Sequence, residues 1–424
     1  MSTLKVNKLR DTAGSADAIT LDPNGGAVLA GVTTVTSVKV GAAVTISESG
    51  IEASGIGITC ANINGGQIGG RRNVIINGDM QIFQRSNSIA DVGGSNGYFA
   101  ADRYRSSNNG SQRHTISQST DTPNGFGNSM KIDVTTANSS PSAANYVFIQ
   151  HRLEGHDVQQ FAKGSSDAKQ YTLSFHVKSP KTGVHVVQWE DVQNTRSISK
   201  SYTVSQANTW EKHIITFDAD TTGAISNDSS HRMQLYFWLM AGSTYNSGSL
   251  ATTWGATGVA NRAAGQVNVF DSTSNDFYIT GIQLEVGPQA TTFEHRSHGE
   301  ELTLCHRYYY KLGKLDYNST HMSANEIYGI GMSDNDDTNI YAMINFPVRM
   351  RDAPTAIDQS GSAADYRVRR DTNKDCTAVP TFVNSAEHFC RVNFPRNGHG
   401  WGTGQMLWCM SAGSSGYLGF SAEL

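Results

Sequence analysis

The sequence predicts an all-β fold: an elongated homotrimer with an intertwined N-terminal β shaft, a central jelly-roll-like β-sandwich, a short helix and a C-terminal β tip domain. Apolar and polar residues alternate with a period of two through much of the chain, as in strands with one buried face. Turn-forming clusters separate these runs, and 42 of the 424 residues are Gly. A chain of this length is expected to form two or three folding units.

Residues 1–70 contain short alternating segments, at 32–40 and 43–46, that Gly residues interrupt. None is long enough to build its own core, and their strand edges would be exposed in a single chain. Both problems disappear if identical chains wrap around a common axis and share an interior. We therefore expect a trimeric shaft, with a Gly-rich leader that becomes ordered only on docking to a larger assembly as the alternative.

Residues 71–296 are expected to form the sandwich. The segment 74–80 is predicted to be a strand that runs into an Asn-Gly turn. Many short strands with few helical signals favour two packed antiparallel sheets. The other predicted strands lie at 145–150, 171–178, 184–189, 212–217, 233–239, 267–270 and 277–286.

The connecting segment 297–313 has acidic residues early and basic residues late, as a helix dipole favours, and Leu302, Cys305, Tyr308 and Tyr309 recur at helical spacing. The pattern predicts a helix from 297 to 311 that packs at a domain or subunit junction. Residues 314–424, the expected tip, return to strand patterns, of which 340–346, 389–394, 405–409 and the final residues 417–424 are the clearest.

Charge and composition exclude several classes of partner. The formal net charge is −4 and the pI is near 6.3, so a basic surface for nucleic acid is not expected. No apolar run has membrane-spanning length, and the N-terminus has no signal-peptide core. The cysteines form no CxxC pair, and we expect buried or inert thiols in a protein that matures in a reducing cytoplasm. They are Cys60, Cys305, Cys376, Cys390 and Cys409.

Six segments follow one another in a specific order: 73–85 (NVIINGDMQIFQR), 98–104 (YFAADRY), 171–178 (YTLSFHVK), 277–287 (FYITGIQLEVG), 291–297 (TTFEHRS) and 300–309 (EELTLCHRYY). Together they resemble the central domain of phage tail-fibre proteins, notably those of marine and cyanobacterial podoviruses. The resemblance implies a trimeric fibre that attaches to tail adaptor or nozzle proteins through its N-terminus. It also implies a carbohydrate-binding-module-like jelly roll and a distal domain that contacts the host surface.

Sugar recognition needs flat apolar rings that stack on the C–H face of a pyranose, with polar groups at the edge that read its hydroxyls. In the tip, the candidates are Trp401, Trp408, His399, Asn397, Tyr366, Arg367 and Arg369. A loop anchor packed on its own domain is the alternative for Trp401. A second candidate patch comprises Tyr245, Trp254 and Asn261. Trp189, Trp210 and Trp238 lie in strand patterns and are expected in the core.

No metal or cofactor is expected. The run 333–339 (SDNDDTN) has oxygen ligands at alternate positions, but it lacks the Gly and terminal Glu of an EF-hand loop, so we expect a solvated turn. His295 and His298 have no evident third ligand for zinc. Rings of His or acidic residues along a trimer axis could hold ions, which one chain does not show.

The chain has no GxSxG elbow, Walker loop or dinucleotide-binding fingerprint, and no long repeats of a parallel β-helix. We therefore expect no enzymatic activity. The sequence favours a tail-fibre protein of the virion, assembled in the host cytoplasm, that attaches phage to host surface polysaccharide by multivalent binding. The alternatives are a structural connector or head fibre without direct receptor binding, and a glycan depolymerase.

Overall fold

Strands provide most of the regular structure in the computed structural model, which confirms the all-β class. The structure describes residues 71–313 and 326–424, and six short strands within the first 70 residues. The chain divides into two compact units, Met1–Ala61 and Asn62–Leu424. The first unit contains two three-stranded antiparallel sheets: β1 (Lys8–Leu9), β2 (Ile19–Leu21) and β3 (Ala27–Leu29), and β4 (Ser37–Val40), β5 (Val44–Ser47) and β6 (Gly50–Ala53). The shared trimeric interior stays a prediction.

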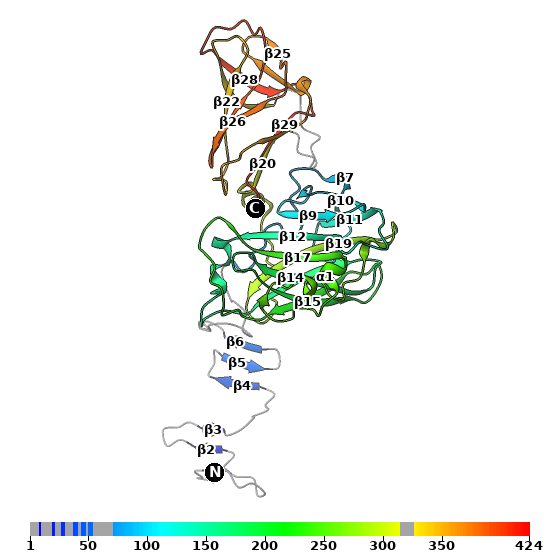
Figure 1. The fold of residues 1–424 in the computed structure, drawn as a ribbon. Coiled ribbons are helices and arrows are strands. Elements are labelled where there is room, and N and C mark those ends of the chain that lie inside the picture. The colour runs from blue at the N-terminus through cyan, green and yellow to red at the C-terminus, as the bar shows by residue number, and fades with distance from the viewer. Residues whose placement is uncertain are drawn as a thin grey trace. The chain divides into compact units, whose positions relative to one another are not determined.

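Two antiparallel sheets form the sandwich (Figure 1). The six-stranded sheet has the order β16-β13-β19-β11-β10-β7, and the seven-stranded sheet has the order β18-β15-β14-β17-β12-β9-β8. The first contains β7 (Ser88–Val92), β10 (Arg113–Ser119), β11 (Ser129–Thr136), β13 (Tyr171–Lys178), β16 (Glu211–Phe217) and β19 (Asp276–Val286). The second contains β8 (Asn96–Tyr98), β9 (Tyr104–Asn109), β12 (Tyr146–Glu154), β14 (Gly183–Asp191), β15 (Arg196–Val204), β17 (His231–Ala241) and β18 (Gly255–Ala256). Four short helices lie in the connections: η1 (Gly155–Phe161), α1 (Ser243–Asn246), η2 (Val259–Asn261) and η3 (Val269–Asp271).

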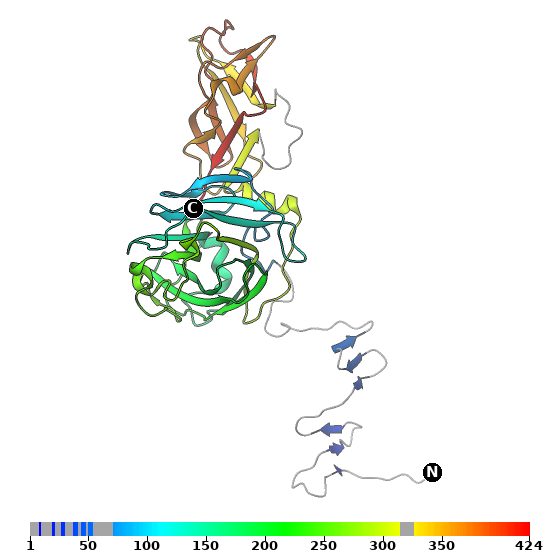
Figure 2. The same cartoon turned by 90° about the vertical axis from the view of Figure 1, so that its right-hand side faces the viewer.

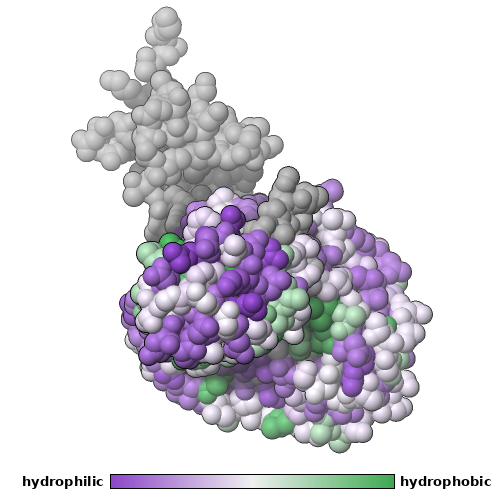
Figure 3. Space-filling model, turned by 90° about the horizontal axis from the view of Figure 1, so that it is seen from above, coloured by the Kyte–Doolittle hydropathy of each residue, from purple (hydrophilic) through white to green (hydrophobic). Residues whose placement is uncertain are grey.

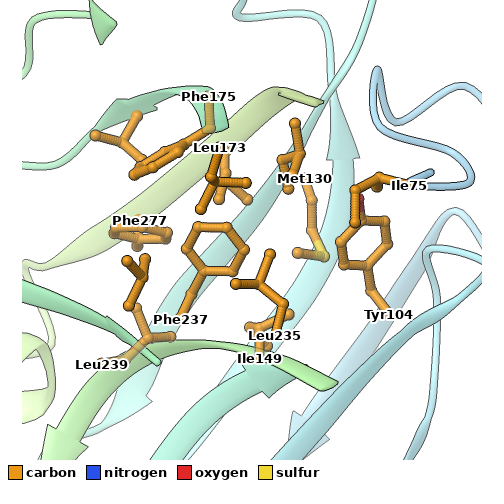
Figure 4. Close-up of a cluster of buried hydrophobic side chains, with 14 of the residues drawn as sticks. Ile75, Tyr104, Met130, Ile149, Leu173, Phe175, Leu235, Phe237, Leu239 and Phe277 are labelled. Atoms are coloured by element: carbon orange, nitrogen blue, oxygen red, sulfur yellow. The ribbon is translucent and has the colours of Figure 1, made fainter. Parts of the chain in front are cut away.

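The core lies between the two sheets, because alternate residues of each strand point inward. Leu173, Phe175 and Phe277 from one sheet face Leu235 and Phe237 from the other (Figure 4). All are at most 1% exposed. Trp189 and Trp238 are fully buried, as predicted.

Two predicted strands are wrong. The segment 74–80 has no strand; instead Asn77 and Met80 adopt positive φ, and the Asn77 amide binds the backbone of Ile82 and Asp102, which replaces a strand ladder. The segment 267–270 leads into a short 3₁₀ helix, η3 (Val269–Asp271), because the Asn268 side chain accepts a hydrogen bond from the backbone of Phe270. Local side-chain bonds of this kind compete with sheet pairing.

The predicted helix is shorter than expected. Helix α2 (His298–His306) begins with a capping box in which Ser297 and Glu300 exchange hydrogen bonds. It ends before Tyr309, because residues Tyr309–Gly313 form strand β20 and pair with the last strand of the chain, β29 (Tyr417–Ser421). Tertiary pairing therefore overrides the helical spacing of the tyrosines.

The C-terminal β domain consists of β20 to β29 and contains two sheets. The three-stranded sheet has the order β20-β29-β23, and the seven-stranded sheet has the order β25-β24-β28-β21-β22-β27-β26. Its further elements are β21 (Ile327–Ser333), β22 (Ile340–Asn345), β23 (Ile357–Gln359), η4 (Ala363–Asp365), β24 (Tyr366–Arg369), β25 (Asn373–Asp375), β26 (Thr381–Ala386), β27 (Phe389–Asn393) and β28 (Met406–Ser411). A core separate from that of the sandwich fills this domain.

The last residues of the chain fasten this domain to the sandwich. The Glu423 carboxylate pairs with the buried Arg103 guanidinium and lies 3.4 Å from that of Arg85. A backbone oxygen of Leu424 accepts hydrogen bonds from Tyr98 (3.0 Å) and Arg152 (2.5 Å). In Figures 1 and 2 the C-terminus accordingly lies between the sandwich and β20.

Hydrophilic residues dominate the described surface seen in Figure 3, and hydrophobic residues form only small patches there. Cys305, Cys376, Cys390 and Cys409 are buried and unpaired, as predicted, whereas Cys60 lies outside the described residues. Burial raises the pKa of Cys376 and of Cys390 to about 12, which makes both weak nucleophiles. Among the described helices, none is long and apolar enough to span a bilayer.

Candidate functional site

The outer face of the seven-stranded sandwich sheet carries an unusual set of aromatic and polar side chains. Residues that point away from the core on β9, β12, β14 and β17 form this set, together with two residues of the connection between β17 and β19. We call it the outer array: Arg105, Ser107, Tyr146, Phe148, Gln150, Gln188, Glu190, Gln234, Tyr236, Trp238, Tyr245 and Arg262.

Aromatic rings form one part of the outer array. Tyr146 and Phe148 stack with their centroids 4.8 Å apart and their planes 18° apart, and both are partly exposed. Phe148 packs edge-on against Trp238, and Tyr245 packs edge-on against Tyr146. Buried Trp238 and Tyr236 thus support a pair of partly exposed rings, and flat apolar rings are what stacking on a sugar requires.

Polar groups form a continuous hydrogen-bonded row beside these rings. Arg105 donates to Gln150 (3.0 Å), Gln150 donates to Gln234 (3.1 Å), and Gln234 donates to Glu190 (2.8 Å). Arg262 then donates to the same carboxylate at 2.9 Å. The row crosses four neighbouring strands, β9, β12, β17 and β14 (Figure 1). Because each group is held by its neighbour, little side-chain entropy remains to be lost on binding.

The charge at the centre of the row is balanced. The Glu190 carboxylate receives hydrogen bonds from Tyr236, Gln234 and Arg262. Burial raises the pKa of Tyr236, so this phenol stays protonated and donates to the carboxylate. Trp238 and Arg262 both donate to the Gln188 amide oxygen, at 3.2 and 3.0 Å. The outer array therefore presents fixed donors and acceptors without an unpaired buried charge.

The three residues of the second predicted patch lie in different surroundings. Tyr245 belongs to the outer array, where it contacts Tyr146 and Trp238. Trp254 instead packs against the sandwich core, and its indole N–H donates to the Asp218 carbonyl at 2.9 Å. The Asn261 amide oxygen accepts from the backbone of Ser249 (3.2 Å), so this residue fastens the connection rather than facing a ligand.

Three residues predicted to bind sugar in the tip are buried, and the prediction is corrected for them. Tyr366 is fully buried, and its hydroxyl donates to the Tyr417 carbonyl at 2.6 Å, so it is part of the core. Trp401 is 8% exposed and stacks on His399, which is fully buried. The loop-anchor alternative for Trp401 therefore describes the structure, because neither ring has a free face.

Among the aromatic residues predicted to bind sugar in the tip, Trp408 stays accessible. It is 43% exposed, and the Arg369 guanidinium carbon lies 5.5 Å from its ring centroid. A shallow pocket of about 220 Å³ lies beside them and includes Ile330 and Met406. The predicted Arg367 pairs instead with Asp375 (3.1 Å), and Asn397 is exposed in the loop that precedes Trp401.

The structure also bears on the predictions for Trp210, for the acidic run 333–339 and for metal binding. Trp210 is partly exposed, not buried, because it lies on the outer face of the six-stranded sheet and donates to Asp121 at 3.0 Å. The acidic run 333–339 forms a turn in which Asp336 accepts from the backbone of Thr338 (3.0 Å). Within the described residues, His, Cys, Asp and Glu side chains form no group that could hold a metal ion.

Comparisons with known proteins give weak structural likeness. No protein-family model and no curated protein matches the chain. Similar solved structures include the enzymatically active domain of tailspike protein 4 of bacteriophage CBA120, with 12% identity and a TM-score of 0.27. The matched region covers 50% of this chain and 21% of the tailspike chain. They also include the family 11 carbohydrate-binding module of the cellulase Lic26A-Cel5E of Clostridium thermocellum (12%, 0.24), covering 45% of this chain and 91% of that chain. A third is TmCBM61 in complex with β-1,4-galactotriose (8%, 0.27; 51% and 99%).

Scores this low carry no argument about the ligand, so the outer array stands on its own geometry. Apart from Tyr245, no residue of the outer array is among the sugar-binding candidates that the sequence indicates. A signal was present: in 146–152 (YVFIQHR) and 234–238 (QLYFW), the positions assigned to solvent by alternation hold aromatic and amide side chains instead of small or charged ones. Aromatic residues on a nominally exposed strand face indicate a binding surface.

Proposed function

We propose that this protein is a bacteriophage tail-fibre protein that attaches the virion to host surface glycan by non-catalytic binding. The observation that carries the proposal is the outer array, in which two accessible stacked rings lie beside a prearranged row of amide, carboxylate and guanidinium groups. The resemblance of residues 71–310 to phage tail-fibre proteins supports the assignment to a virion.

The array suits an extended glycan chain. Rings such as those of Tyr146 and Phe148 cover the apolar side of a pyranose, and the partly exposed carboxylate and guanidinium groups of the polar row read its hydroxyls. The buried amides of Gln150 and Gln234 link Arg105 to Glu190 across the strands and hold these two partly exposed charged groups in position, so that successive sugar units can each find partners. A single site of this kind is expected to bind weakly.

A trimer would raise the weak affinity of each site through avidity. In support of self-association, the outer face of the seven-stranded sheet of the C-terminal β domain exposes a group of large apolar side chains, which we call the C-terminal apolar face. It comprises Ile330 (53% exposed), Met332 (54%), Met343 (55%), Met406 (66%) and Trp408 (43%). Neighbouring copies of the chain could cover these side chains.

Loss of the accessible rings should weaken glycan binding. We expect the Tyr146→Ala/Phe148→Ala double variant to lose at least tenfold in affinity for host polysaccharide, measured by glycan array and by adsorption of the purified protein to host cells. Val259→Ala, at an exposed residue that is not part of the array, is the matched control. Undiminished adsorption of the double variant would refute the array as the receptor site.

The tip alternative is tested with Trp408→Ala rather than by deleting residues 314–424. Such a deletion also removes Glu423 and leaves the buried Arg103 without its partner. If Trp408→Ala weakens adsorption and the double variant does not, the receptor site lies on the C-terminal β domain. Non-catalytic binding further predicts that prolonged incubation with host envelope releases no oligosaccharides.

A further inference from the structure

A second polar and aromatic concavity lies between the sandwich and the C-terminal β domain. This groove, of about 450 Å³, is lined by Arg85, Tyr98, Phe99, Tyr309, Asp358 and Tyr417. Its residues come from both sides of the junction: β8 supplies Tyr98, and β20, β23 and β29 supply Tyr309, Asp358 and Tyr417. We call it the junction groove.

Cation–π contacts and a hydrogen bond hold rings of the junction groove in place. The Arg85 guanidinium carbon lies 3.7 Å from the ring centroid of Tyr309 and 5.6 Å from that of Tyr98. The Tyr98 hydroxyl donates to the backbone of Leu424 at 3.0 Å, and the Lys311 ammonium lies 4.5 Å from the ring centroid of Tyr417. These cation–π contacts and hydrogen bonds fix the ring positions before any ligand arrives.

Polar groups of the groove retain unused hydrogen-bonding capacity. Within the described residues, neither the Tyr309 hydroxyl nor the exposed Asp358 carboxylate has a hydrogen bond or ion pair of its own. The Gln359 amide oxygen accepts a hydrogen bond from the backbone N–H of Gly361 (2.7 Å). The NH₂ group of Gln359 therefore points away from Gly361. One hydroxyl, one carboxylate and one amide donor thus surround the aromatic rings.

A glycine brings two of these groups together. A Cβ atom at Gly419 would lie 2.2 Å from the Tyr309 hydroxyl and 3.1 Å from the Asp358 Cβ. Strands β23 and β29 pair Asp358 with Gly419 directly. The absence of a side chain at this position therefore lets the Tyr309 hydroxyl reach the strand that carries Asp358.

The charge balance selects the class of ligand. The Arg85 charge is matched by Glu423 at 3.4 Å and Asp102 at 3.9 Å, so it offers no surplus positive charge to an acidic ligand. The accessible Asp358 carboxylate would repel an anion and accept hydrogen bonds from vicinal hydroxyls. We propose that the junction groove is a second binding site, separate from the outer array, for a neutral saccharide.

In this site an aromatic face of Tyr98, Phe99 or Tyr417 covers the C–H side of one pyranose. The Asp358 carboxylate accepts from adjacent hydroxyls, and Tyr309 and Gln359 read the remaining edge. Because the walls come from two domains, an occupied groove also joins the sandwich to the C-terminal β domain.

Saturation-transfer NMR and titration calorimetry on the full chain test this site. The probes are the methyl glycosides of glucose, galactose and mannose, with cellotetraose and maltotetraose. We expect the best probe to bind at least tenfold more weakly to Asp358→Asn and to Tyr309→Phe, both of which preserve side-chain shape. Asp167→Asn, at an exposed carboxylate outside the groove, is the control and keeps the affinity of the unchanged chain.

The Tyr146→Ala/Phe148→Ala variant separates this site from the outer array. Neutral-probe binding that survives in this variant and is lost in Asp358→Asn supports the junction groove, whatever becomes of host adsorption. Binding that is lost in the double variant and unchanged in Asp358→Asn and Tyr309→Phe overturns the junction groove and leaves the proposed function intact. Absence of saturation transfer to every probe also overturns it.

Discussion

Glu423 balances two arginine side chains that the fold removes from water. Arg103 is fully buried beneath the Tyr308 ring, with its guanidinium carbon 3.4 Å from the ring centroid. Burial lowers the pKa of Arg103, but Glu423 together with Tyr308, Tyr98 and Asp157 raises it, and the net direction is upward. The contact is thus a buried charge pair that joins the penultimate residue to the sandwich.

Removal of this carboxylate should destabilise the protein strongly. We expect Glu423→Gln to lower the free energy of unfolding by about 3–5 kcal/mol, because it leaves a buried guanidinium uncompensated. Glu300→Gln, which breaks the exposed pair with Arg71, should change this free energy little, because solvent screens that pair. Chemical denaturation followed by circular dichroism measures both, and equal costs would contradict the assignment of Glu423 as the junction anchor.

Buried histidines make stability depend on pH. Burial lowers the pKa of His114 and of His185 to about 4, below the ordinary value of 6.5. Between these values the unfolded chain binds protons that the folded chain does not, so stability falls as pH decreases from 6.5 to about 4. Burial raises the pKa of Asp102 to about 6, which opposes this trend because the folded chain binds that proton more tightly.

We expect the free energy of unfolding to be lower at pH 5 than at pH 7.5, and the difference to shrink in His114→Gln. The quantity compared is the slope of the unfolding free energy against pH. A general loss of stability in the variant does not change that slope. His156→Gln changes an exposed histidine and should keep the slope of the unchanged chain. A slope unaffected by His114→Gln would show that this histidine is not buried and neutral.

At the scale of elements, one glycine lies at the register shift between β13 and β19. Strand β19 places Gly281 and Ile282 opposite a single residue of β13, because the register shifts between Ser174 and His176. Gly281 has a φ of +64°, as expected of a bulge residue. A Cβ there would lie 2.6 Å from the Phe126 ring and 2.9 Å from the His176 ring.

Gly281→Ala should therefore destabilise the sandwich by about 1–3 kcal/mol, through backbone strain and the clash with Phe126. Gly127→Ala, at a position with open space around it, is the control and should change stability little. Thermal unfolding of the two variants checks the prediction, and similar melting temperatures would argue against a bulge at Gly281.

At the scale of the whole molecule, the proposed function depends on association. The full chain should form a trimer by light scattering coupled to gel filtration, and removal of residues 1–61 should shift it toward smaller species. Trp408→Lys then tests whether the C-terminal apolar face contributes, since a charge on this face opposes its burial between copies. A stable monomer of the full chain would contradict the fibre and its avidity.

Much of the fold was predictable from local patterns. The period-two alternation at 171–178 coincides with β13, and Trp189 is buried between the two sheets, as its strand pattern predicts. The prediction failed where long-range contacts outweigh local preference. Tyr309 has helical spacing but pairs in β20, and Asn77 exchanges hydrogen bonds with Ile82 in place of a ladder.

The candidate sites were less predictable than the fold. Tyr366 and Trp401 have the residue types of sugar readers, yet the tertiary structure packs one into the core and the other onto His399. The outer array and the junction groove draw residues from strands far apart in the chain, so no local spacing marks them. Their chemistry depends on which strands become neighbours.

The sequence by itself determined the all-β class, most strand positions, the burial of four cysteines and the turn at 333–339, because alternation, thiol character and turn composition act over a few residues. Only the tertiary structure decided which aromatic rings stay accessible and which arginine side chains are buried away from solvent. Sheet order and the docking of Glu423 bring together groups hundreds of residues apart, and side-chain exposure follows from that packing rather than from residue type.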